Sequence, residues 1–247
     1  SDMVDNLKGF GGVDIINGGP GDSFALDFTL GSAASTIEGS SFLRTVTVDD
    51  RAAVDWTGST VNYGDGSGAV SLAVDSSGKF ALYHTWADNG IYVVTVSIVD
   101  DIGQSLIRTL NVAVDNANPV PAINSISATR VEGTAINFAG SGTDPAGVSD
   151  PLTYLWNFGD GSPGVIGANA EYTFADNGTY LVTLTVTDGD GGSAAVTRTI
   201  TVSNVVPTAS LAGPTTATTG STVTILSTTA DAAGAADPLT LQWTVTR

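Results

Sequence analysis

The residues of this chain that could do chemistry are almost all aspartates. Of its 25 acidic residues only Glu38, Glu132 and Glu171 are Glu, and 8 Lys and Arg leave a net charge of −17. Asp is favoured in turns and at cation sites, whereas Glu favours helices. A chain this acidic repels phosphate backbones and anionic lipid surfaces, which argues against nucleic acid and membranes as partners. Its loop carboxylates direct attention to hard cations such as Ca²⁺.

The side chains needed for nucleophilic catalysis are scarce. The chain has no Cys and a single histidine, His84, so Cys–His pairs and His-rich zinc sites are unavailable. No Gly-x-Ser-x-Gly motif accompanies the histidine, and its place before Trp86 at the start of a strand indicates a packed or hydrogen-bonded role. Paired carboxylates for glycoside hydrolysis would lie on turns without an evident cleft. We therefore expect no enzyme activity in this chain.

An internal repeat organises these residues. Residues 84–101 read HTWADNGIYVVTVSIVDD and residues 172–189 read YTFADNGTYLVTLTVTDG. Upstream, VNYGDGSG (61–68) matches WNFGDGSP (156–163), and DPLTLQWTVTR (237–247) parallels DPLTYLWNFGD (150–160). A repeat of this length is typical of modules arranged as beads on a string.

Each copy has the pattern of an antiparallel β-sandwich. Runs of alternating polar and apolar residues end at Gly, Asp and Asn, and no segment shows helical spacing. Trp156 is expected to be a buried sandwich tryptophan, replaced by Val61 in the first copy. Tyr180 and Tyr92 follow Asn-Gly where a long strand begins, which predicts tyrosine corners. Asp65 and Asp160, each between two glycines, are expected to cap tight turns.

Together these motifs resemble the polycystic-kidney-disease (PKD) domain family. Tyr-x-Trp-x-Phe-Gly-Asp-Gly (154–161) is followed by Tyr-x-Phe-x-x-x-Gly-x-Tyr-x-Val-x-Leu-x-Val-x-Asp (172–188). The resemblance implies an all-β fold of tandem immunoglobulin-like sandwiches, and an extracellular spacer or interaction module. We expect a lead segment (1–33), a first sandwich (34–117), a second (118–206) and an incomplete third (207–247).

The lead segment resembles the calcium-binding nonapeptide repeat of RTX proteins. Gly-Phe-Gly-Gly-Val-Asp-Ile-Ile-Asn (9–17) departs from that pattern at Phe10, and the next repeat loses its register after Gly21. About three repeats are needed before such turns bury a common face. Two interpretations stay open: a linker without an ion, or a working calcium site that uses Asp14 or Asp22.

The sandwich topology predicts that loop carboxylates gather at one end of each module. In the second module the chain entry and two loops would share that end. We expect a calcium site among Asp115, Asn116, Asn118, Asp144, Asp150, Asp188 and Asp190. In the first module the corresponding residues are Asp49, Asp100 and Asp101, and Asp231 and Asp237 begin the pattern again.

Crowded carboxylates repel one another unless a hard cation joins them, so calcium at the junctions would stiffen the string. The linker Val-Asp-Asn-Ala-Asn-Pro (114–119) has some likeness to the calcium-binding linkers of cadherins. The alternative is that these aspartates only cap turns and keep the surface soluble.

Two functions remain open. The modules are structural or adhesive segments of a large bacterial surface protein or fibre, in contact with surface protein, polysaccharide or copies of themselves. Alternatively they are accessory modules that hold a secreted hydrolase on an insoluble substrate. A binding module should display a row of exposed aromatic rings, for which Trp56, Tyr63, Tyr83 and Trp86 are the candidates.

Residues 207–247 are expected to supply three strands of a third sandwich, the last around Trp243. Half a sandwich exposes its inner face and an unpaired edge. Three explanations stay open: the sequence is a fragment, a neighbouring chain completes the sheet, or the remaining strands are not ordered. No export signal begins at Ser1, so we expect any such signal to lie outside this sequence.

Overall fold

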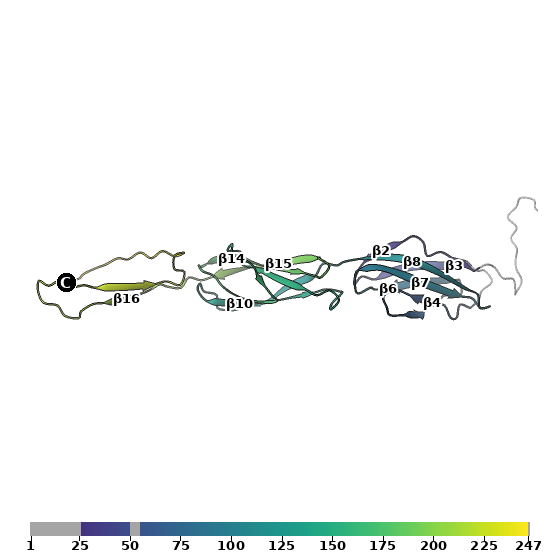
Figure 1. Cartoon of the computed structure of the whole chain (residues 1–247), viewed down its shortest axis with the longest axis horizontal. Helices are drawn as coiled ribbons and strands as arrows, with labels where there is room; N and C mark the ends of the chain where they lie inside the picture. Colours follow the sequence, from purple (N-terminus) through teal and green to yellow (C-terminus); the bar gives the residue numbers. More distant parts are fainter. Residues whose placement is uncertain (1–25, 50–54, 247) are drawn as a thin grey trace, which may run out of the picture. The chain divides into compact units, whose positions relative to one another are not determined.

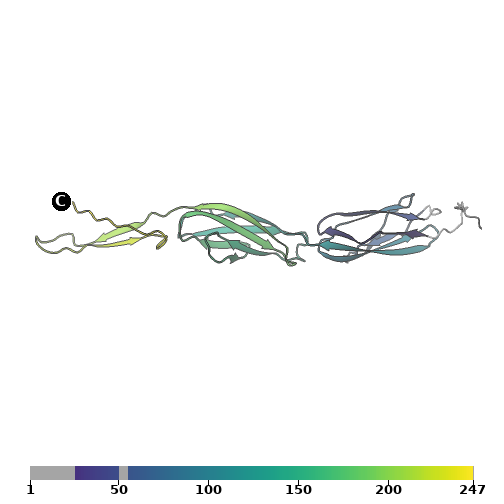
Figure 2. The same cartoon turned by 90° about the horizontal axis from the view of Figure 1, so that it is seen from above.

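The computed structural model describes residues 26–49 and 55–246. Within these ranges the chain consists of strands β1 to β17, which confirms the all-β prediction. No helix of the described residues is long and apolar enough to span a membrane. Two compact units are present (Figures 1 and 2). Unit 2 comprises Ile37–Gly39, Ala87–Asn89 and the chain from Asp115 onward, and unit 1 holds the rest.

Unit 1 is a sandwich of two sheets. One sheet has the order β1-β3-β6 and the other the order β2-β8-β7-β4-β5. The longest ladder joins β7 to β8 in antiparallel register from Gly90↔Val114 to Val99↔Ser105. The strands are β1 (Asp27–Phe28), β2 (Ala34–Ile37), β3 (Phe42–Asp49), β4 (Thr60–Asn62), β5 (Ala69–Ser71), β6 (Lys79–His84), β7 (Gly90–Val99) and β8 (Ser105–Asp115).

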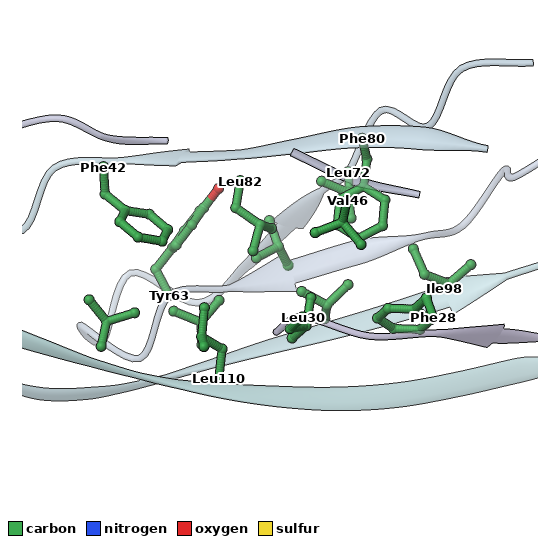
Figure 3. Close-up of a cluster of buried hydrophobic side chains, with 14 of the residues drawn as sticks. Phe28, Leu30, Phe42, Val46, Tyr63, Leu72, Phe80, Leu82, Ile98 and Leu110 are labelled. Atoms are coloured by element: carbon green, nitrogen blue, oxygen red, sulfur yellow. The ribbon is translucent and has the colours of Figure 1, made fainter. Parts of the chain in front are cut away.

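The core of unit 1 lies between these sheets. Alternate residues of β7 point inward, and Val94, Val96 and Ile98 are fully buried, because successive side chains of a strand face opposite sides. Figure 3 shows rings and aliphatic side chains from both layers meeting in this interior. Val61 is 2% exposed and lies in this core, as expected for the residue that replaces the tryptophan.

Unit 2 contains a second sandwich with the same plan. Its sheets have the orders β13-β10-β9 and β12-β11-β14-β15. The β14–β15 ladder runs antiparallel from Gly178↔Val202 to Thr187↔Ser193. The strands are β9 (Val120–Ile126), β10 (Ala135–Thr143), β11 (Thr153–Asn157), β12 (Val165–Ile166), β13 (Asn169–Thr173), β14 (Gly178–Thr187) and β15 (Ser193–Val202).

The predicted sandwich landmarks are confirmed in unit 2. Trp156 of β11 is fully buried, and its indole N–H donates to the Gly167 carbonyl at 3.0 Å. The Tyr180 hydroxyl donates to the backbone carbonyl of Asp176 at 2.8 Å, which is a tyrosine corner. In unit 1 the ring of Tyr92 stacks on Trp86 at 5.5 Å between centroids.

The end of the chain differs from the prediction. Strands β16 (Thr208–Ala212) and β17 (Leu226–Ala230) form an antiparallel pair. Residues 237–246 form no strand, so the third strand expected around Trp243 is absent. The physical reason is the ladder: β11, its counterpart in the repeat, obtains its hydrogen bonds from β14 and β12. The described residues after 230 contain no such partner strand, and the Trp243 side chain is 54% exposed.

Candidate functional site

The site begins with the loop between β10 and β11. Asp144 opens this loop, and its Oδ1 accepts the Ala146 N–H at 3.0 Å. The Ser149 N–H donates to the Ala146 carbonyl at 3.2 Å, which closes the turn. Asp150 ends the loop and is 1% exposed, with Oδ1 accepting the Gly189 N–H. In each carboxylate, Oδ1 therefore accepts a backbone N–H, and Oδ2 has no hydrogen-bond partner.

Glu38 reaches the same loop from a distant part of the sequence. Its backbone N–H donates to the Asp115 carbonyl at 3.0 Å, and its Oε1 accepts the Ala117 N–H at 3.0 Å. Gly39 follows with φ of +69°, and a Cβ there would lie 2.7 Å from the Pro145 Cβ. The Glu-Gly turn therefore lies directly against the loop, and Glu38 is 2% exposed.

Three carboxylates meet as a result. One carboxylate oxygen each from Glu38, Asp144 and Asp150 lie within 4.8 Å of one another. Glu38 Oε2, Asp144 Oδ2 and Asp150 Oδ2 are buried and have no hydrogen-bond partner. Buried polar atoms are rarely left unpaired, because losing water without a replacement is costly. We call these residues the first acidic cluster.

The environment of Glu38 and that of Asp150 disfavour ionisation of these two carboxyl groups. Burial raises the pKa of Glu38 above its usual value of 4.5, and the charges of Asp144, Asp150 and Asp88 add to this, while the Ala117 N–H opposes it. Burial likewise raises the pKa of Asp150, helped by nearby Asp188 and opposed by the Gly189 N–H. A bound cation would favour the ionised carboxylates and so offset the rise in pKa that burial and like charges cause.

A second acidic cluster repeats the first. One oxygen each from Glu132, Asp231 and Asp237 lie within 4.8 Å of one another. Glu132 is fully buried, donates its N–H to the Ser203 carbonyl at 3.1 Å, and accepts the Val205 N–H on Oε1 at 2.7 Å. Asp231 Oδ1 accepts the Ala233 N–H at 2.9 Å, and its Oδ2 is buried and unpartnered. The bonds of Glu132 and Asp231 match those of Glu38 and Asp144 in the first cluster.

Of the other residues predicted in the second module, Asp115, Asp188 and Asp190 are not part of the first acidic cluster. Asp188, 5% exposed, caps the β14–β15 hairpin: Oδ1 accepts the Gly192 N–H at 2.6 Å. Its Oδ2 accepts the side-chain amide of Asn116 at 3.0 Å, and Asn118 Oδ1 accepts the Ser193 N–H at 3.2 Å. Asp115 and Asp190 are exposed.

The predicted residues of the first module join no such group among the described residues. Asp100 caps the β7–β8 hairpin, where its Oδ1 accepts the Gln104 N–H at 2.6 Å and the Ile102 N–H at 3.1 Å. Asp49 and Asp101 are exposed. Asp14 and Asp22 lie outside the described residues, so their role stays a prediction.

Sequence reasoning missed the two glutamates of the clusters. A signal was available, because two of the three Glu in the chain precede a glycine at equivalent points of the repeat, in Ile-Glu-Gly-Ser (37–40) and Val-Glu-Gly-Thr (131–134). The loops of a single module do not reveal it, because Glu38 precedes the first sandwich's β3 and yet contacts the loop that contains Asp144.

His84 has a structural role. Its ring stacks on Tyr63 with centroids 4.0 Å apart, and its Nε2 lies 2.8 Å from Asp65 Oδ2. Asp65 also caps its turn, accepting the N–H and hydroxyl of Ser67 on Oδ1 at 3.0 and 2.6 Å. The Ser67 hydroxyl is the main cause that lowers the pKa of Asp65 to about 2, and His84 contributes.

Unit 2 builds the same arrangement without a histidine. Tyr172 stacks on Phe158 with centroids 3.9 Å apart, and its hydroxyl donates to Asp160. Asp160 Oδ1 accepts the Ser162 N–H at 3.1 Å, so the predicted turn-capping role of Asp65 and Asp160 is confirmed. The equivalence of His84 and Tyr172 indicates that the position serves packing and turn closure rather than catalysis.

Comparison with known proteins finds relatives for part of the chain. Residues 116–203 match the family model of the PKD domain. Human Polycystin-1 is 33% identical over 114 residues, which is 45% of this chain and 3% of that protein. The PKD1 domain of Vibrio cholerae metalloprotease PrtV is 31% identical, with 35% of this chain and 98% of that chain covered and a TM-score of 0.29. For the PKD1 domain of Vibrio anguillarum Epp the values are 26%, 36%, 96% and 0.30. Residues 116–203 are a PKD domain.

Proposed function

We propose that the chain is a non-catalytic structural segment of a large extracellular or cell-surface protein, in which tandem PKD-like sandwiches act as a spacer. The supporting observation is that three of the four candidate aromatic residues are buried. Trp56, Tyr63 and Trp86 are 6%, 7% and 1% exposed and belong to the core of unit 1. Rings committed to a core are not available to stack on a polysaccharide or to grip an extended ligand.

The chemistry of the surface supports the same function. His84 is held by a ring stack on Tyr63 and a contact with Asp65. The carboxylates of Glu38, Asp144, Asp150 and Asp188 each accept a backbone N–H group. Long antiparallel ladders such as β7–β8 and β14–β15 give each sandwich many main-chain hydrogen bonds. Modules with such ladders would suit a spacer between other domains.

The competing function is an accessory module that holds a hydrolase on its substrate. One observation favours it: Tyr83 of β6 is 63% exposed and lines a depression of unit 1 together with Val70 and His84. Tyr83 is the one exposed aromatic ring among the described residues of unit 1, and one ring is a weaker platform than a row, since each stacked aromatic contributes separately to binding.

Retention on insoluble ligands separates the two functions. The full chain is mixed with chitin, cellulose and collagen beads, and the bound fraction is compared with that of a Tyr83→Ala variant. The spacer function predicts no retention above that of an unrelated acidic protein. Retention that the Tyr83→Ala substitution abolishes would overturn the spacer function and support the accessory module.

Calcium binding is the second part of the proposal. Hard cations at the acidic ends of the modules would join loops that otherwise repel one another, and so stiffen the segment. The RTX-like lead segment, with Asp14 and Asp22, would be a further place for calcium. Partners would be surface proteins, polysaccharides or neighbouring copies of the chain.

A further inference from the structure

We propose that the first acidic cluster is a binding site for a hard divalent cation of the calcium class, and that the second acidic cluster is a repeat of this site. The inference deepens the calcium part of the proposed function, and it moves the site from the loops of one module to a Glu-Gly turn facing such a loop. Glu38, Asp144 and Asp150 supply the first site, and Glu132, Asp231 and Asp237 the second.

The unpartnered oxygens are the first argument. Glu38 and Asp150 are 2% and 1% exposed, yet Glu38 Oε2 and Asp150 Oδ2 have no donor. The other oxygen of each carboxylate is bonded to a backbone N–H, so both side chains are fixed in orientation. A buried carboxylate oxygen without a donor is costly unless a positive charge pairs with it. Two fixed carboxylates with such oxygens are therefore arranged to bind a cation.

The donor set identifies the class of ion. The cluster offers carboxylate oxygens only, which suit hard cations and not the thiolate- or imidazole-seeking metals. Ca²⁺ takes about six to eight oxygens in flexible geometry, whereas Mg²⁺ usually keeps several waters and uses one or two carboxylates. Three converging carboxylates therefore favour Ca²⁺.

The repetition is the second argument. Each Glu accepts an N–H from the following linker, Ala117 in one case and Val205 in the other. Each Glu precedes a glycine of positive φ, +69° at Gly39 and +67° at Gly133. A Cβ at these glycines would lie 2.7 Å from the Pro145 Cβ and 3.0 Å from the Ala232 Cβ of the facing loop. A turn-capping role for Asp explains neither glutamate, because Glu38 and Glu132 cap no turn of the Asp loops. The recurrence of the Glu-Gly turn, its linker bond and the facing aspartates points to a shared ligand.

A cation in each cluster would tie a Glu-Gly turn to an Asp loop. Gly39 already lies against Pro145, and Gly133 against Ala232. Without the ion, these contacts bring like charges together, and with it the same contacts become attractive. The ion would therefore link the turn to the loop, and its removal would make the loop more mobile.

Calorimetric titration with CaCl₂ tests the inference. The reference is the full chain carrying Asp14→Asn and Asp22→Asn, freed of metal by a chelator, so that the lead segment contributes no site. We expect two bound Ca²⁺ in the reference, one after Glu38→Gln, one after Glu132→Gln and none after both. The matched control is Glu171→Gln, an exposed carboxylate of β13, which should leave two sites.

At each mutated site we expect the affinity for Ca²⁺ to fall by about tenfold or more, because mutation of a residue that only contacts a metal ligand already costs that much. Two sites with unchanged affinity in the double variant would overturn the inference and place the ions elsewhere, for instance around Asp188. A single site in the reference that only Glu38→Gln removes would overturn the second copy. Mg²⁺ binding as tightly as Ca²⁺ would overturn the assignment of the ion class.

Thermal unfolding checks that the Gln variants report on the ion. In EDTA they should unfold at the same temperature as the reference or a higher one, because a like charge has been removed. In saturating CaCl₂ they should unfold below it. A lower unfolding temperature in EDTA would contradict the inference, since the carboxylates would then stabilise the fold without a cation.

These results are independent of the spacer function. Retention on chitin, cellulose or collagen would defeat the spacer while leaving the calcium stoichiometry as it is. Absence of calcium binding would defeat the two sites while leaving the retention result as it is.

Discussion

Glu38 and Glu132 make the same pair of main-chain hydrogen bonds in two successive repeats. Each donates its N–H to the carbonyl at the end of a module, Asp115 or Ser203, and each accepts an N–H two residues further along the chain. Both carboxylates also lie close to two aspartates of a loop, so the first and second acidic clusters share the same arrangement of their glutamate.

The first prediction concerns pH. The pKa of Glu38 and that of Asp150 are raised by burial and neighbouring charge, so the native state holds these protons more tightly than the unfolded state. Without calcium, their contribution to the free energy of unfolding should fall as pH rises from about 4 through the raised pKa values. Urea unfolding from pH 4 to 7 in EDTA measures it, and Glu38→Gln should flatten the slope. An unchanged slope in that variant would contradict the assignment.

The second prediction concerns the Glu-Gly turn. Gly39→Ala places a Cβ at positive φ and 2.7 Å from the Pro145 Cβ, so both backbone strain and collision oppose it. We expect a loss of about 1 kcal/mol or more in the free energy of unfolding. Gly103→Ala is the matched control, because φ is +83° there and no atom lies within 4 Å of the added Cβ. Equal losses in the two variants would mean that the loop does not press on Gly39.

The third prediction concerns the Asp65 turn. The pKa of Asp65 is lowered to about 2, chiefly by the Ser67 hydroxyl, so its ionised form stabilises unit 1 at pH values above 3.8. That contribution should disappear as pH falls towards 2. Asp65→Ala should therefore cost about 1 kcal/mol at pH 6 and much less near pH 2, measured by urea unfolding. A cost that is equal at both pH values would show that charge plays no part.

The fourth prediction concerns the tyrosine corner. Tyr180→Phe removes the hydroxyl that donates to the Asp176 carbonyl at 2.8 Å, and leaves the ring in place. We expect a loss of about 1 kcal/mol in the free energy of unfolding of unit 2. Tyr83→Phe, at a 63% exposed residue, should change stability by less than about 0.5 kcal/mol. Similar effects at both positions would contradict the corner.

Much of the fold follows from local pattern. Trp156, Tyr180 and the Asp160 turn were predictable because each depends on residues near in sequence or on strict alternation along a strand. The strand expected near Trp243 was wrong for a physical reason. A strand is stabilised by its ladder, and a favourable pattern does not replace the partner that β14 provides for β11.

The candidate site was predictable only in part. Asp144 and Asp150 were expected together because one loop carries both. Asp100 and Asp188, which were predicted from the next hairpin loops, cap those hairpins in the structure, and whether they also bind an ion stays a prediction. Glu38 could not be placed from its own module, because its partners depend on how the Ala117 linker leads into the following loop.

The most direct test of the account is the calcium dependence of stability in the full chain. We predict that saturating CaCl₂ raises the free energy of unfolding relative to EDTA, by about 2.7 kcal/mol for each site at a free concentration of 100 Kd. The rise should disappear when Asp14→Asn, Asp22→Asn, Glu38→Gln and Glu132→Gln are combined. An unfolding free energy that is the same in calcium and in EDTA would contradict the account.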